Sequence, residues 1–321
     1  MKERFLVTGA TGCIGAWTVR NLVREGICTC ALVRPGSLHR LKLIMNEKEL
    51  AAVEFVSGDI TDISAIENAL AENKITHIIH LAAMQFPFCK ADPPLGAAVN
   101  VQGTVNIFEA ASRCGIRRLV YASSTAVYGP DNEYAAGPLA HDALLKPRSH
   151  YGVYKQANEG TARVYWLDNG ISSIGIRPYV VYGPGRDQGM TSTPTKAMLA
   201  AAAGKPYNIS YGGRFGFQYA DDAAKAYIDA ARVDFQGAEV FNLGGETVGM
   251  EDVVGAIEAA EPYARGTITY TDNALPFPAH IDNAPFVELL GVLRVTPLDV
   301  GVAQSIRIFK KALSEGKMAA D

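Results

Sequence analysis

The sequence lacks long apolar runs and any excess of one charge. No apolar run approaches the ~20 residues that a membrane span needs. The 30 Lys and Arg residues nearly balance the 33 Asp and Glu residues, for a net charge of −3, so we expect no nucleic acid and no membrane as partner. The apolar part of the opening letters MKERFLVTGATG is too short for a signal peptide. We therefore expect a cytoplasmic protein that binds a small molecule.

Paired cysteines are also missing. The chain has five cysteines, an odd number, and no Cys-x-x-Cys pair. The histidines do not have the spacing of metal ligands, so we expect no metal site. We expect buried, reduced thiols at Cys13, Cys28, Cys30, Cys89 and Cys114.

The sequence does contain a regular alternation of strand-like and helix-like segments. Apolar strand-like runs alternate with segments of helical periodicity, and hydrophobic residues make up 48% of the chain. The expected strands are 4–10, 28–33, 52–59, 76–83, 116–124, 171–178 and 238–245, and the expected helices are 17–26, 64–73, 98–115 and 152–170. Strands separated by helices of this length predict an α/β fold, a doubly wound parallel sheet of the Rossmann type.

The alternation loosens after Pro178 into loops rich in Gly and Pro. We expect a smaller C-terminal substrate lobe built from insertions after the main sheet. The predicted dinucleotide-binding domain covers 1–178 plus about 217–260, and the predicted lobe covers about 179–216 and 261–321.

The first chemical motif is TGATGCIG, residues 8–15, between the first expected strand and helix. Gly9, Gly12 and Gly15 permit a tight turn and a close approach of the backbone to a ligand. The helix that follows presents free N–H groups to an anion. The motif predicts a pyrophosphate site, and the alternative is a glycine-rich turn without a ligand.

The end of the second strand normally indicates which dinucleotide binds. An acidic residue there would bond the ribose 2′-hydroxyl, but this chain has Arg34, with Ser37 and Arg40 nearby. A guanidinium suits a 2′-phosphate, so we favour NADP over NAD; the alternative is a solvated surface arginine. Asp59 follows the third strand, where it would reach the adenine or cap a helix.

The stretch YGVYK, residues 151–155, contains two tyrosines and one lysine. On a helix, Tyr151 and Lys155 are four residues apart and share a face, whereas Tyr154 points elsewhere. The stretch by itself is also compatible with an ordinary helical pair.

These motifs together resemble the extended short-chain dehydrogenase/reductase family, which includes the nucleotide-sugar epimerases. The resemblance rests on TGATGCIG, GDITD, LAAMQFPFCKADP, NVQGT, YASSTAVYG, YGVYK, IRPYVVYGPG and GGRFGFQYADDAA, in the family's order. It implies a nicotinamide cofactor and a catalytic set of Ser124, Tyr151 and Lys155, with Asn100 as a structural asparagine of the active-site helix. The expected cofactor-binding residues are Gly9, Thr11, Gly12, Cys13, Ile14, Gly15, Arg34, Ser37, Asp59, Ile60, Leu81, Ala82, Ala83, Tyr151, Lys155 and Pro178.

The residue types suit hydride-transfer chemistry. A tyrosine has a pKa of about 10 and is a poor base at neutral pH, and a nearby ammonium such as Lys155 is expected to lower that pKa. Tyr151 then removes the hydroxyl proton while Ser124 bonds the same oxygen. Ser123 and Thr125 are neighbouring hydroxyls that compete with Ser124 for this role.

The substrate is less well specified. In nucleotide-sugar members of the family, an arginine seven residues before an Asp contacts the diphosphate, and Arg214 precedes Asp221 at that spacing. The alternative is an arginine that pairs with Asp221 or Asp222. The second family arginine is missing before Asp282, which favours a smaller hydroxylated substrate. The expected substrate contacts are Ser124, Thr125, Tyr151, Tyr179 and Arg214.

Residues that are missing from the sequence also limit the reactions that we expect. Family members that dehydrate nucleotide sugars carry an Asp-Glu pair where this chain has Thr125 and Ala126, so dehydration is not expected. We predict an NAD(P)-dependent oxidoreductase acting on a sugar-like or polyhydroxylated molecule. The alternatives are a UDP-sugar type 4-epimerase with tightly bound NAD and a non-catalytic NADP-sensing regulator. The resemblance also implies a homodimer formed through the helices that begin near Val99 and Gly152.

Overall fold

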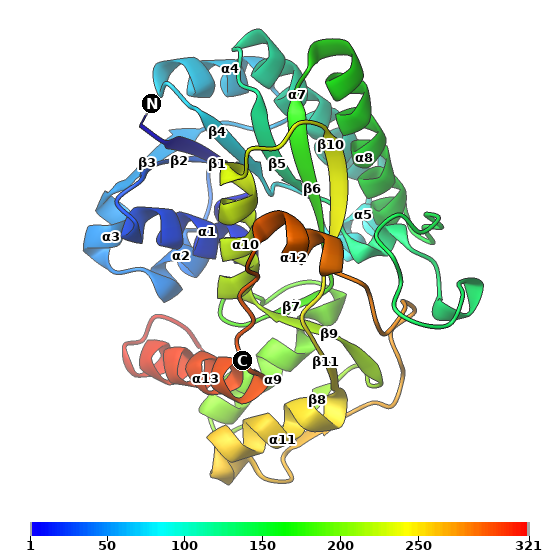
Figure 1. Ribbon diagram of the computed structural model, residues 1–321. Coiled ribbons are helices and arrows are strands. Elements are labelled where there is room, and N and C mark those ends of the chain that lie inside the picture. Colours follow the sequence, from blue (N-terminus) through cyan, green and yellow to red (C-terminus); the bar gives the residue numbers. More distant parts are fainter. Residues whose placement is uncertain (1, 320–321) are drawn as a thin grey trace.

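A computed structural model describes residues 2–319 (Figure 1). Its larger part is a seven-stranded sheet, ordered β10-β6-β5-β4-β1-β2-β3, in which every neighbouring pair is parallel. The strands are β1 (Arg4–Thr8), β2 (Cys28–Val33), β3 (Val53–Ser57), β4 (His77–His80), β5 (Arg118–Ala122), β6 (Ser172–Pro178) and β10 (Ala238–Leu243). The predicted doubly wound parallel sheet is confirmed.

Helices cover both faces of this sheet. Helices α1 (Cys13–Arg24) and α10 (Ala220–Arg232) pack together on one face, and α4 (Ile63–Glu72), α7 (Gly103–Arg113) and α8 (His150–Asn169) pack on the other (Figure 1). Strand side chains alternate between the faces: Phe5 and Val7 join the core beneath α1, whereas Leu6 joins the core beneath α4 and α7. Burial on both faces explains why the strands are almost continuously apolar.

Short helices fill the connections. They are α2 (His39–Ile44), α3 (Glu47–Ala51), α5 (Phe86–Ala91) and α6 (Pro93–Ala97). The helix predicted over 98–115 begins with a π-helical turn, Ala98–Gln102, and continues as α7. Ser149 caps α8 by accepting a hydrogen bond from the Gly152 N–H, so α8 begins two residues before the predicted start.

A smaller lobe lies against the carboxyl end of the main sheet (Figure 1). It contains a three-stranded sheet, ordered β11-β9-β7, and a two-stranded sheet, β12-β8. Its elements are β7 (Val180–Tyr182), α9 (Thr193–Ala202), β8 (Tyr207–Ile209), β9 (Arg214–Tyr219), β11 (Glu246–Gly249), α11 (Met250–Ala260), β12 (Ile268–Tyr270) and α13 (Leu298–Ser314). Helix α12 (Ala284–Leu290) packs instead against β10 of the main sheet.

The boundary between the two parts differs from the prediction near residue 260. The main sheet receives its last strand, β10, up to Leu243. The next strand, β11, pairs with β9 in the lobe, and α11 packs against α13 and α9. Residues 246–260 therefore belong to the lobe, because their apolar side chains are buried against its helices rather than against the main sheet.

All five cysteines are free thiols. Cys30 and Cys89 are buried, as predicted, whereas Cys13 and Cys28 are half-buried and Cys114 is exposed, so the prediction of burial is wrong for Cys114 and only partly right for Cys13 and Cys28. Within residues 2–319 no group of three or more His, Cys, Asp or Glu side chains could hold a metal ion. No helix in the same range is both long and apolar enough to cross a membrane.

Candidate active site

A cavity of about 720 Å³ opens at the carboxyl ends of the central strands. Strand order reverses between β1 and β4, since the connections that leave these two neighbours run in opposite directions along the sheet. Open parallel sheets bind ligands in the crevice at such a point. The cavity therefore lies where this fold favours a cofactor.

The glycine turn between β1 and α1 lines one part of this cavity. Gly9 has a φ of +67°, and a Cβ on it would lie 2.6 Å from the backbone nitrogen of Ala82. A Cβ on Gly15 would lie 2.1 Å from the Gly9 carbonyl oxygen. Gly12, at the N-cap of α1, has no side chain to bond the first N–H groups. These groups and the positive end of the helix dipole fit a pyrophosphate.

The predicted cofactor residues meet at this cavity although they come from separate segments. Those that line it are Gly9, Thr11, Gly12, Cys13, Ile14, Gly15, Arg34, Ser37, Asp59, Ile60, Leu81, Ala82, Ala83, Tyr151, Lys155 and Pro178. Arg34 is 73% exposed in its side chain and lies 3.8 Å from the Asp59 carboxylate. The same carboxylate accepts hydrogen bonds from the N–H and hydroxyl of Thr61. Asp59 thus closes the turn before α4 and also faces the cavity.

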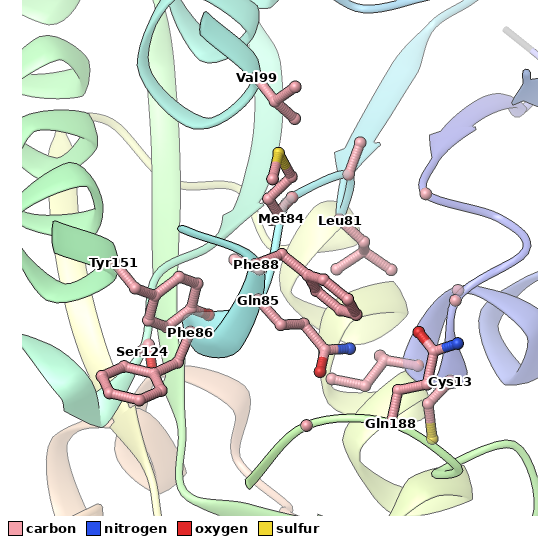
Figure 2. A pocket seen from close by; sticks show the side chains of 18 of the residues that line it. Cys13, Leu81, Met84, Gln85, Phe86, Phe88, Val99, Ser124, Tyr151 and Gln188 are labelled. Atoms are coloured by element: carbon pink, nitrogen blue, oxygen red, sulfur yellow. The ribbon is translucent and has the colours of Figure 1, made fainter. Parts of the chain in front are cut away.

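Ser124, Tyr151 and Lys155 come together at the other end of the cavity. Ser124 follows β5, and the other two lie one turn apart on α8. The side chains of Ser124 and Tyr151 are hydrogen-bonded, and they lie close together in Figure 2. The Lys155 ammonium lies 5.7 Å from the Tyr151 ring centroid and donates a 2.6 Å hydrogen bond to the Ala122 carbonyl.

Burial is the largest influence on the pKa values of Tyr151 and Lys155. Burial raises the pKa of Tyr151, and the Ser124 hydrogen bond and the Arg186 charge only partly oppose it. Burial also lowers the pKa of Lys155 to about 8. The expectation that Lys155 lowers the pKa of Tyr151 differs from this result, because the ammonium is bonded to a backbone carbonyl and desolvation of the phenol outweighs the favourable charges.

The hydroxyl groups of Ser123, Ser124 and Thr125 have different hydrogen-bond partners. Ser123 donates to the carboxylate of Glu159, which forms a buried ion pair with Arg177 at 2.6 Å. Thr125 donates to the Pro178 carbonyl. Ser124 is the hydroxyl bonded to Tyr151, and its catalytic role stays a prediction. Tyr154 donates instead to the Pro93 carbonyl, 2.9 Å away, which fits a packing role.

Asn100 lies in the π-helical turn behind the cavity wall. It donates to the Met84 carbonyl at 3.0 Å and accepts from the Met84 N–H at 2.7 Å. These two bonds fix the segment that follows β4 and lines the cavity. Asn100 is not among the cavity-lining residues, so its geometry is that of a structural asparagine.

Comparisons with known proteins agree with this geometry. Residues 5–244 match the NAD dependent epimerase/dehydratase family. The chain belongs to this family. The resemblance to extended short-chain dehydrogenases/reductases is thereby confirmed.

Proteins similar to this family member include epimerases, and a dehydrogenase shares its fold. A UDP-glucose 4-epimerase of Mycolicibacterium smegmatis is 30% identical, over 96% of this chain and 98% of the relative. The crystal structure of a Thermus thermophilus UDP-glucose 4-epimerase in complex with NAD has a TM-score of 0.80 at 25% identity, covering 96% and 99% of the two chains. A monomeric L-threonine 3-dehydrogenase from a metagenome, at 22% identity, shares the fold with a TM-score of 0.80 over 96% and 99%. The protein is thus an enzyme of the NAD dependent epimerase/dehydratase family.

Several cavity residues of this family member were missed in the sequence. Gln85, Phe86, Phe88, Arg186, Gln188, Met190 and Phe277 line the cavity, and Figure 2 shows the first three reaching into it together with Gln188. The only signal for them was their place in loop segments that follow strands β4, β7 and, for Phe277, β12. Their orientation depends on how the two lobes meet, which no local pattern encodes.

Arg40 and Asp187 join the two parts of the protein across the cavity. The Arg40 guanidinium pairs with Asp187 at 2.6 Å and donates to the Thr11 carbonyl of the glycine turn at 2.9 Å. His39 bonds the same Asp187 carboxylate at 2.9 Å. The segment after β7 is thereby held against the glycine turn. The positive charge of Arg40 is balanced by the Asp187 carboxylate.

Arg214 is not at the site. It is absent from the cavity lining, its side chain is exposed, and it donates to the Thr247 carbonyl at 3.2 Å. The expected substrate contact of Arg214 is therefore not supported. The alternative is also wrong, because Asp221 and Asp222 pair with Arg294 instead.

Proposed function

We propose that the protein is an NADP-preferring oxidoreductase that interconverts a hydroxyl and a carbonyl on a polyhydroxylated small molecule. The observation that carries this proposal is the set of Ser124, Tyr151 and Lys155 within one cavity that continues to the glycine turn. Tyr151 accepts the hydroxyl proton during oxidation and returns it during reduction. Ser124 hydrogen-bonds the same substrate oxygen, and Lys155 binds the nicotinamide ribose.

The residues fit a nicotinamide dinucleotide. A Cβ on Gly9 or Gly15 would clash with the backbone of Ala82 or of Gly9, so both positions need glycine to keep the turn compact. The N-terminus of α1 is uncapped by side chains. When bound, the cofactor accepts or supplies the hydride. The chain itself has to orient the substrate oxygen between Ser124 and Tyr151 and to keep water from it.

The catalytic assignment is tested with Tyr151→Phe. We expect kcat to fall by about 10²- to 10⁴-fold, because proton transfer in the transition state is lost. The assay follows nicotinamide absorbance with a panel of sugars, sugar acids and polyols. Cofactor affinity, measured in parallel, should change little.

Two outcomes count against the assignment. Retention of most turnover by Tyr151→Phe would show that another group transfers the proton. Tight cofactor binding by the wild type without turnover of any panel member would favour a cofactor-sensing regulator.

The preference for NADP is supported by Arg34. Its guanidinium lines the cavity beside the end of β2 and lies 3.8 Å from the Asp59 carboxylate, which is its one acidic partner among residues 2–319. A 2′-phosphate offers it shorter, charge-assisted hydrogen bonds.

We expect wild-type protein to bind NADPH more tightly than NADH. Arg34→Gln should weaken NADPH binding by about 10- to 100-fold and leave NADH binding unchanged, since a hydrogen bond to a charged group contributes about 1.5–3 kcal/mol. Arg307→Gln, on α13 and outside the cavity lining, is the control. Tighter binding of NADH by the wild type would refute the preference.

A second candidate is a UDP-sugar 4-epimerase with tightly bound NAD. It is favoured by the 30% identity to an epimerase over 98% of that relative's length. It is opposed by the position of Arg214 outside the cavity and by the lack of an arginine just before Asp282. NAD that copurifies and survives gel filtration would favour this candidate, whereas cofactor-free protein favours a dehydrogenase.

We further propose a cytoplasmic homodimer that pairs through α7 and α8. Val153, Val164 and Leu167 are apolar residues on α8 with exposed fractions of 48%, 54% and 70%. Their spacing places them on one face of the helix. An exposed apolar face on a long helix supports pairing with a second copy.

A further inference from the structure

Two consecutive residues at the end of β5 are hydrogen-bonded to two successive turns of α8. The Ala122 carbonyl accepts a 2.6 Å hydrogen bond from the Lys155 ammonium. The next residue, Ser123, is buried and donates its hydroxyl to the carboxylate of Glu159. Lys155 and Glu159 are four residues apart on α8 and share a face of it. The helix therefore holds the end of the strand just before Ser124.

The position of Ser124 depends on these bonds. Ser124 directly follows Ser123, and its side chain is hydrogen-bonded to Tyr151, which lies beside it in Figure 2. On the other side of Ser124, Gly152 of α8 approaches the chain so closely that a Cβ on it would lie 2.1 Å from the Ala126 carbonyl oxygen. Ser124 is thus held from both sides against the helix that carries Tyr151.

A buried ion pair orients the Glu159 carboxylate. Arg177 of β6 donates its Nε to Oε1 at 2.8 Å and its Nη2 to Oε2 at 2.6 Å. The side chains of Arg177 and Glu159 are only 5% and 8% exposed. The Arg177 guanidinium is itself fixed, since it also donates to the Tyr128 hydroxyl and to the His141 carbonyl. The carboxylate oxygen that accepts from Ser123 is therefore held in one orientation.

Stability alone does not account for this ion pair. Removing two charged groups from water is costly, and well-packed apolar side chains often replace a buried ion pair without loss of stability. Apolar side chains cannot accept a hydrogen bond from Ser123, however, whereas the Glu159 carboxylate does. The pair with Arg177 therefore fits the orientation of a neighbouring group.

The Glu159 carboxylate also acts on the Lys155 ammonium. Burial lowers the pKa of Lys155 to about 8, and the Cys89 thiol of α5 and the Glu159 carboxylate oppose this effect. Burial raises the pKa of Cys89 and lowers that of His80, on β4, to about 3, so both are uncharged near pH 7. Burial likewise raises the pKa of the Tyr151 phenol. Glu159 is thus the negative charge that acts on Lys155 near pH 7.

We propose that Glu159 is a positioning residue of the active site, which fixes Ser124 in place by holding Ser123. Its negative charge also favours the ammonium form of Lys155. Glu159 is not among the cavity-lining residues, so it acts through these neighbours and not on the substrate. The inference rests on the proposed function, because Ser124 and Lys155 serve the hydride transfer proposed above.

Titration of Lys155 tests the effect of the charge without any turnover. Protein labelled with ¹³C at the lysine Cε is titrated by NMR, and Lys155→Met identifies the Lys155 signal. We expect Glu159→Gln to lower the pKa of Lys155 by about one pH unit, because loss of an opposite charge disfavours the ammonium. The double variant Glu159→Gln/Arg177→Gln should do the same, and it avoids an unpaired buried arginine. Ser123→Ala, which keeps the carboxylate, and Glu72→Gln, at an exposed position on α4, should titrate as the wild type does.

Ser123→Ala tests the positioning of Ser124. The variant removes the hydroxyl that bonds Glu159 and keeps the ion pair with Arg177, so it should fold. We expect kcat with the panel of sugars, sugar acids and polyols to fall by about 10- to 100-fold, because a small displacement of a catalytic group is costly. The KM and the Kd for the nicotinamide nucleotide should not change. A crystal structure of this variant should show the Ser124 hydroxyl beyond hydrogen-bond distance of Tyr151.

Three results would overturn the inference. One is a pKa of Lys155 that is unchanged in both Glu159 variants. The others are a wild-type kcat for Ser123→Ala, which is what a purely structural role predicts, and a crystal structure of that variant in which Ser124 still bonds Tyr151. Failure of the proposed function is distinguishable. Wild-type protein that turns over no panel member, together with the expected titration and crystal structure, contradicts only the function.

Discussion

At the scale of single residues, burial changes the pKa values of the groups in this site. Lys155 is 3% exposed, and burial holds its pKa at about 8 instead of 10.5. An ammonium in this position is strongly disfavoured by desolvation. A buried lysine that destabilises the fold in this way fits a group that binds a ligand rather than one that stabilises the fold.

Because Lys155 is buried, the free energy of unfolding of the protein should depend on pH. Between about pH 8 and pH 10.5 the unfolded chain binds the Lys155 proton and the folded chain does not, so wild-type stability gains as pH rises through this window. Lys155→Met removes this contribution. We expect the free energy of unfolding of Lys155→Met, relative to wild type, to be highest near pH 7 and to decrease toward pH 10.

Urea unfolding at several pH values measures this difference. Lys42→Met, at an exposed position on α2, is the control for loss of a lysine. A difference between Lys155→Met and wild type that stays constant from pH 7 to pH 10 would contradict the burial of a titrating ammonium.

At the scale of elements, α8 combines two functions on different faces. Its inner face places Tyr151 and Lys155 in the cavity, and its outer face exposes Val153, Val164 and Leu167. The inner face could be predicted, because the four-residue spacing of Tyr151 and Lys155 sets their relative position on any helix. The exposed apolar face suggests that α8 also forms the proposed interface between subunits.

Light scattering tests this interface. Wild-type protein should have twice the mass of one chain, and Leu167→Glu should shift it toward the monomer, because a charge on the apolar face is costly to bury. Val292→Glu is the matched control, since Val292 is 78% exposed in the loop between α12 and α13. A monomeric mass for the wild type at all concentrations would show that the apolar face has another role.

At the scale of the whole molecule, the active site depends on how the lobe meets the main sheet. Arg40 and His39 hold Asp187 beside the glycine turn, and the Trp17 indole N–H donates to the Pro184 carbonyl at 2.9 Å. These long-range contacts bring the segment after β7 across the cavity. They are the reason why Arg186 lines the same cavity as Tyr151 although the two lie on different segments of the chain.

The sequence by itself determined the features that depend on short-range geometry. The doubly wound sheet follows from hydrophobic periodicity, the glycine turn from the need for backbone without Cβ atoms, and the Tyr151–Lys155 pair from helical spacing. Tertiary structure alone decided which hydroxyl among Ser123, Ser124 and Thr125 bonds Tyr151, and that Arg186 rather than Arg214 lines the cavity. The physical reason is that these choices depend on distances between segments that are remote in sequence, which only the packing of the folded chain sets.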